Sequence, residues 1–136
     1  MRSLGRYIKA AIKAKIDGLG YNVYANYVPA SEQDTHILIS DVTDTDQSTM
    51  QTSDTEHTIQ VAIYSKENIA NSGAIVDQLA DDVMQAIYPT PDATLDIDEA
   101  QSLGIALQGV AEQTIQLNSF IVYNKILTFR LNYFIQ

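Results

Sequence analysis

The residues of this sequence that could do chemistry are the carboxylates of a polar stretch, residues 43–56, and two histidines. Met50 is the only apolar residue of the stretch. Five carboxylates lie in it or just before it: Asp41, Asp44, Asp46, Asp54 and Glu56. Carboxylate oxygens suit Ca²⁺, but an EF-hand loop also needs a glycine at its turn and a glutamate at its twelfth position, and this order of residues provides neither. A metal-binding or hydrolytic domain that uses the acidic stretch stays an alternative interpretation, with no metal ligands assigned.

The two histidines, His36 and His57, each begin a predicted strand. If Val42 pairs with His57 in a hairpin, His36 pairs with Ile63, so the histidines lie at opposite ends and cannot share a metal ion or a proton. The absence of cysteine excludes disulfides, thiol nucleophiles and thiolate metal sites. Motifs of serine hydrolases, zinc peptidases and phosphate-binding loops are also missing, as is any signature of a small-ligand module. We therefore expect no enzyme, no catalytic residues and no cofactor.

Charge divides the chain into a basic beginning and an acidic body. The net charge is −9, yet five of the eight Lys and Arg residues fall within the first fifteen positions. Four of them, at steps of four, three and four, share one face of a predicted helix: Arg2, Arg6, Lys9 and Lys13. This face is either simply solvated or contacts an acidic neighbour. The net charge argues against sequence-specific nucleic-acid binding, and no signal peptide or membrane span is apparent, so we expect a soluble, non-secreted protein.

These side chains must be positioned by a sheet whose main strand is the last one. Apolar residues alternate with polar ones from Phe120 to Ile135, with only Lys125 interrupting the apolar face, and again from His57 to Ser65. These two runs predict neighbouring antiparallel strands. Further strands are predicted at 21–24, 36–42, 94–97 and 102–112, with Gly109 as a possible bulge. Residues 43–56 then become a long polar hairpin loop, which we expect to become ordered when it binds a partner.

Two helices complete the prediction. The first runs from Ser3 to about Asp17 with a stripe of Leu4, Ile8, Ala11 and Ile12, and the second from about Ser72 to Tyr88 with Ser72 or Asn71 as its cap. The apolar stripe of the second helix comprises Ile75, Val76, Leu79, Val83 and Ile87. Its far side carries Asp77 and Asp81, which are either solvated or face the basic helix of another subunit. The predicted fold is one α+β domain, residues 1–136, with two helices packed on an antiparallel sheet.

The order of these elements resembles the tail-completion, or tail-terminator, proteins of long-tailed bacteriophages, which are neck proteins of head–tail joining. The resemblance starts with the basic helix and continues through Val23-Tyr24, Val28-Pro29 and the strand Ile37 to Ser40. The strand Thr58 to Ser65, the helix with Leu79 to Val83, and the closing strand also fit. Asp34-Thr35-His36 replaces a Pro-aromatic pair common in the family, and residues 89–117 match no part of it. Another neck or head-completion role therefore stays open.

The resemblance implies a virion structural protein without enzymatic activity, located in the tail or neck and assembled in the bacterial host cytoplasm. Its partners would be further copies of itself in a ring of about six subunits, the tail tube protein, and the head connector or stopper protein. An acidic body suits a channel through which DNA slides, because negative walls repel phosphates. We expect the contacts with neighbouring subunits to involve seven residues: Arg2, Arg6, Lys9, Lys13, Asp44, Asp46 and Met50.

Overall fold

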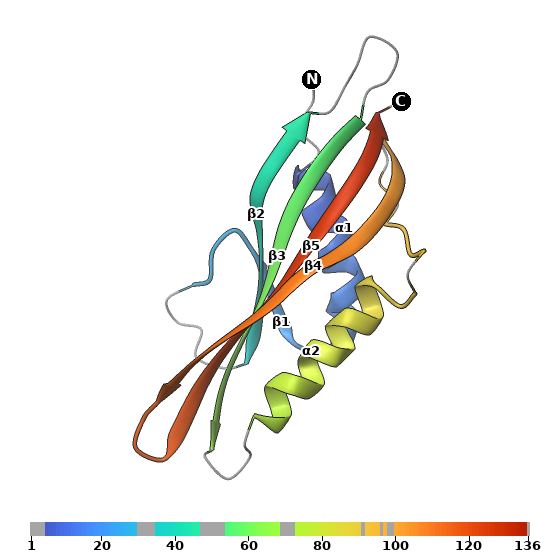
Figure 1. The fold of residues 1–136 in the computed structure, drawn as a ribbon. Helices are drawn as coiled ribbons and strands as arrows, with labels where there is room; N and C mark the ends of the chain where they lie inside the picture. Colours follow the sequence, from blue (N-terminus) through green and yellow to red (C-terminus); the bar gives the residue numbers. More distant parts are fainter. Residues whose placement is uncertain are drawn as a thin grey trace.

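The fold is a five-stranded sheet with two helices, seen in a computed structural model that describes residues 5–29, 35–46, 54–68, 73–90, 92–95, 97 and 100–135. The sheet order is β1-β2-β3-β5-β4 (Figure 1). Its strands are β1 (Asn22–Ala25), β2 (His36–Asp46), β3 (Asp54–Asn68), β4 (Ala100–Gln116) and β5 (Phe120–Ile135). The helices are α1 (Gly5–Ile16), followed by the 3-10 turn η1 (Asp17–Leu19), and α2 (Ala74–Ile87). The predicted α+β class is confirmed.

The centre of the sheet is the antiparallel pair β3 and β5, as the alternation of apolar residues predicts. On β3, Ile59, Val61 and Ile63 are fully buried, whereas the residues between them are half-buried. The same alternation along β5 buries Leu127, Phe129, Leu131 and Tyr133, and the register places Ile59 opposite Phe129. One face of the sheet therefore forms the core with the helices.

The helices bury apolar stripes against this face. Three isoleucines of α1, Ile8, Ile12 and Ile16, are fully buried at helical spacing. Leu4 lies outside the described residues. On α2, Ala80 takes a buried place that the prediction gave to Ile75, whose side chain is 41% exposed. Among the described residues, no helix is long and apolar enough to cross a membrane.

Strand β1 corrects the prediction of a purely antiparallel sheet, because it pairs parallel to β2, with Val23 opposite Ile37. Residues 26–35 connect the two strands. A connection of this length can return the chain to the same end of the sheet, whereas a tight turn at Val28-Pro29 would have produced an antiparallel pair.

The polar stretch 43–56 also differs from the prediction of a single long loop. Residues 43–46 belong to β2 and residues 54–56 to β3, where Thr45 pairs with Glu56. Threonine is polar but favours β-strands, so the polar composition of residues 43–56 did not distinguish strand from loop. At the start of β2 the register differs by one residue from the predicted one, because Tyr64 rather than Ile63 lies opposite His36. A bulge between Asp41 and Thr43 adds a second residue, so that Asp44 rather than Val42 lies opposite His57.

Strand β4 is longer than predicted and carries two bulges. One lies between Leu107 and Gly109, which confirms the predicted bulge, and the other between Ser102 and Gly104. The bulges break the alternation, so Leu103 is 54% exposed although it fits an inward pattern. Within residues 94–97, the structure has only an isolated bridge at Ile97 among the described positions, so the strand predicted there is wrong. Side-chain hydrogen bonds, not a ladder, hold this segment, as described below.

The far end of the β4–β5 hairpin projects beyond the helices (Figure 1). Every residue from Leu107 to Phe120 is exposed. Five of them are large and apolar, with exposed fractions between 37% and 62%: Leu107, Val110, Ile115, Leu117 and Phe120. Exposed apolar residues that lie close together often mark a surface that contacts other molecules.

Candidate functional site

The basic face of α1 is the predicted interaction surface that the structure brings together most clearly. The Arg6 guanidinium donates to the Tyr7 hydroxyl at 2.8 Å and lies 4.8 Å from the centre of the Tyr7 ring. Lys9 Nζ donates to Asn26 Oδ1 at 2.6 Å, and Lys13 pairs with Asp17 at 3.2 Å. The fourth predicted residue, Arg2, lies outside the described residues. The observed cations thus remain at the surface, as the 4-3-4 spacing predicts.

A shallow groove of about 390 Å³ runs between this helix and β1. Its lining is Arg6, Lys9, Ala10, Lys13, Ala25 and Asn26. Three of these six residues are cations and none is an acid, while the two alanines contribute no long side chain. The Lys13–Asp17 pair is an exposed i,i+4 contact worth only about 0.3–0.5 kcal/mol, so Lys13 can exchange this partner for another carboxylate. The groove, which we call the basic groove, therefore suits an anionic group on a small protruding surface.

The other predicted interaction residues are not gathered into one site by the structure. Asp44 and Asp46 lie in β2, opposite His57 and Thr55, instead of in a loop. Met50 lies outside the described residues. No part of the basic groove is formed by these positions.

The acidic face of α2, made by Asp77, Asp81 and Asp82, is the second charged surface. Asp77 pairs with Lys125 of β5 at 3.0 Å, while Asp82 accepts a hydrogen bond from the neutral Gln78 amide at 3.0 Å. Asp81 is exposed, and no cation pairs with it in the part of the chain that the structure describes. Two carboxylates of this face thus have no cationic partner among the described residues.

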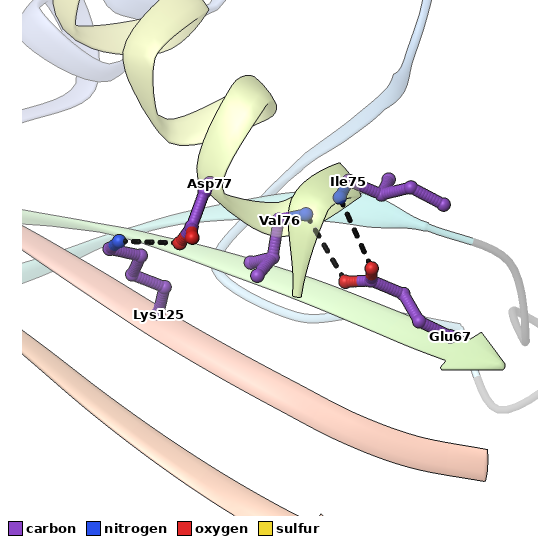
Figure 2. Close-up of polar contacts among 5 residues, drawn as sticks. All are labelled: Glu67, Ile75, Val76, Asp77 and Lys125. Carbon is purple, nitrogen blue, oxygen red and sulfur yellow. Dashed lines mark hydrogen bonds and ion pairs between the residues drawn. The ribbon is translucent and has the colours of Figure 1, made fainter. Parts of the chain in front are cut away.

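Glu67, at the end of β3, is a buried carboxylate that sequence reasoning missed. It is only 1% exposed and accepts hydrogen bonds from the backbone N–H groups of Ile75 at 3.1 Å and Val76 at 3.2 Å (Figure 2). It thus caps α2 from another element. The predicted cap was Ser72 or Asn71, but the residue at this position is Gly73, whose φ of 79° favours glycine and whose absent side chain leaves the helix N–H groups to Glu67.

Tyr123 lies beside this cap and responds to the local negative charge. Burial raises the pKa of its hydroxyl, and the carboxylates of Glu67, Glu112 and Asp77 raise it further. The tyrosine ring also packs where a side chain on Gly73 would sit, because a Cβ built there would lie 3.2 Å from the ring. The start of α2 is therefore fitted closely to β3 and β5.

A second buried network holds the segment before β4. Tyr133 donates its hydroxyl to the Leu95 carbonyl at 2.7 Å, and the Leu95 N–H donates to Ser102 Oγ at 3.2 Å. Both peptide groups of this residue are thus satisfied by side chains instead of a strand partner. Tyr133 was expected only as an apolar face residue, so its hydroxyl had no predicted role.

The two histidines lie on opposite faces of the sheet and make aromatic contacts. His36 stacks on Tyr64 with ring centres 4.7 Å apart, and His57 meets Tyr133 edge-on at 6.2 Å. The two histidines lie far apart, as predicted, because His36 is opposite Tyr64 and seven residues separate Tyr64 from His57 along β3. Within the described ranges, no group of three His, Asp or Glu residues is arranged to hold a metal ion.

Comparison with known proteins gives matches at the level of structure. No protein-family model and no curated protein sequence matches the chain. A chain in the solved structure of the virion of a native gene transfer agent particle matches with a TM-score of 0.74 and 15% identity, over 98% of this chain and 99% of that one. A second solved structure matches with a TM-score of 0.58 and 9% identity, over 93% and 94%. The protein therefore shares its whole fold with a chain of a virion particle.

Proposed function

We propose that the protein is a structural component of a phage-like virion that forms a ring at the head-proximal end of the tail. The ring ends growth of the tail tube and joins the tail to the head. The observation that carries this proposal is the fold match to a virion chain over nearly the full length of both chains. The resemblance of the element order to tail-terminator proteins supports the more specific role.

Physical features of the surface support an assembly protein. The exposed apolar residues of the β4–β5 hairpin suit contacts with other protein chains better than permanent exposure to water. The basic groove and the acidic face of α2 offer complementary charge on one molecule. The ring contacts include Arg2, Arg6, Lys9 and Lys13, together with the segment that carries Asp44, Asp46 and Met50. The chemistry is recognition, not catalysis.

The test is assembly of the purified protein, first alone and then with tail tubes. We expect light scattering to show a mass that rises with concentration to a closed oligomer, and negative-stain microscopy to show rings. Incubated with purified tail tubes, the protein should appear at one end of each tube and stop its extension. A protein that stays monomeric at every concentration and leaves tube ends bare would refute the role.

The alternative is another neck or head-completion component. The same fold and surface charges suit that role, and the two differ in the partner that is bound first. A tail terminator binds the tube end without the head, whereas a head-completion protein binds the portal-bearing head without the tube. Sedimentation of the protein with each purified particle separates the two functions.

A further inference from the structure

We propose that the basic groove binds the acidic face of α2 from a second copy of this chain, so that copies join head to tail. This inference rests on the proposed function, because it specifies the contact between subunits of the ring. The contact is electrostatic. It pairs Arg6, Lys9 and Lys13 of one subunit with Asp81 and Asp82 of the next.

One cation of the groove, Arg6, and two carboxylates of α2, Asp81 and Asp82, have no oppositely charged partner among the described residues of their own copy. Arg6 contacts Tyr7, and no carboxylate pairs with it among residues that the structure describes. On the other surface, Asp82 is bound by the neutral Gln78 amide and Asp81 is exposed. Opposite charges of this kind across an interface favour the correct partner and speed its encounter.

The basic groove and the acidic face of α2 lie on different helices, so a contact between them joins different parts of two copies. Helix α1 packs on β1 and β2, α2 packs on β3 and β5, and the two helices also pack on each other. The basic groove is lined by residues of α1 together with Ala25 and Asn26, and β1 forms one edge of the sheet. The two surfaces are thus different parts of the molecule, and a contact that joins different parts of identical copies produces rings when its rotation closes.

The shape of the groove suits a helix face as the occupant. Ala10 and Ala25 place only methyl groups in the lining, so another backbone can come close. Arg6 and Lys13 are separated by seven residues of α1, which is about 10 Å along a helix, and so the cations span two turns. On α2, Asp77 and Asp81 are one turn apart on the same side of the helix, whereas Asp82 lies about 100° further around it, so the carboxylates border one broad exposed face.

The experiment is a charge exchange between two variants. The first is Arg6→Glu with Lys9→Glu, which makes the groove acidic, and the second is Asp81→Lys with Asp82→Lys, which makes the α2 face basic. Each variant alone should need at least about tenfold more protein for half-assembly than the wild type, since like charges then meet at the contact. A one-to-one mixture should regain assembly, because the acidic groove of the first variant accepts the basic helix of the second, and the reverse contact keeps opposite charges too.

A matched control tests charge reversal on the same helix outside the groove. Lys15 is exposed on α1 and does not line the groove, so Lys15→Glu should assemble like the wild type, whereas Arg6→Glu alone should not. Circular dichroism before and after heating checks that every variant is folded. Arg6→Glu is well placed for this purpose, because a glutamate in the first turn of a helix is favourable.

The outcomes separate this contact from the function it serves. Wild-type assembly, loss in each variant and recovery in the mixture support the contact. Wild-type assembly without recovery in the mixture overturns it and leaves the ring intact, with the groove then open to an acidic partner other than a second copy. A wild type that neither assembles alone nor caps tail tubes overturns the ring itself.

Discussion

The cap on α2 supplied by Glu67 is a contact whose contribution to stability can be measured. The perturbations are Glu67→Gln, which keeps the shape and one acceptor oxygen, and Glu67→Ala, which removes both. Two backbone donors depend on this side chain, one of them, that of Val76, fully buried. Neither donor has an alternative partner within the first turn of a helix, whose N–H groups point away from the helix body.

The expected magnitudes follow from these bonds. A buried donor left without a partner costs about 1–3 kcal/mol, and loss of a helix cap typically costs about 1 kcal/mol. We expect Glu67→Gln to lower the free energy of unfolding by about 1–2 kcal/mol, because its amide can accept one of the two bonds. Glu67→Ala should lower it by about 2–4 kcal/mol, because both donors are orphaned and a space is left.

The assay is urea unfolding followed by far-UV circular dichroism, at a protein concentration below that of assembly. The midpoint should fall while the slope with urea stays constant, since the surface exposed on unfolding is the same. Glu112→Gln is the matched control, because it makes the same chemical change on an exposed residue of β4, and it should stay within about 0.5 kcal/mol of the wild type. Equal midpoints for Glu67→Gln and Glu112→Gln would refute the reasoning.

Three further predictions concern the buried network and the start of α2. Tyr133→Phe should lower the free energy of unfolding by about 1–2 kcal/mol, because the buried Leu95 carbonyl loses its donor; a thermal melt equal to that of the wild type would contradict this. Gly73→Ala should destabilise the protein by about 1 kcal/mol or more, since its φ of 79° and the nearby Tyr123 ring both oppose a methyl group; an unchanged melting temperature would show that the helix start shifts freely. The pKa of Tyr123 is higher in the folded protein than its ordinary value of 10.0, so its contribution favours the folded state below about pH 10 and is lost as pH rises through the folded pKa. Tyr123→Phe should therefore reduce the alkaline loss of stability in unfolding curves measured across that range, and an identical pH profile would contradict it.

The strongest sequence patterns correspond to elements that are organised by burial. The alternation in β3 and β5 predicts both strands and their pairing, because one face of each must enter the core. The basic face of α1 is equally visible, since residues three and four apart share a helix face. The sequence does not show which residues line the groove opposite α1. Ala25 and Asn26 line it only because β1 packs beside α1 in the fold.

The errors come from long-range pairing that local composition does not encode. Residues 43–46 are polar, yet they extend β2 because β3 offers a continuous set of partners. Glu67 left a signal that the prediction did not use: it lies on the inward parity of β3, two residues beyond Ser65 and four beyond Ile63. A carboxylate on a buried face requires hydrogen-bond donors, and the start of the following helix provides them. Extending the alternation past Ser65 would have identified the cap.

The bulges of β4 limit how its exposed edge can pair with other strands. Strand β4 is the outer edge of the sheet, 17 residues long, and Glu112 is its only charged residue. An unpaired edge with so little charge is a template for aggregation through pairing with other exposed strands. The bulges divide the edge into residues 100–102, 104–107 and 109–116, so a straight incoming strand cannot pair along its length. Single copies of the chain can therefore stay dispersed although this edge carries only one charge.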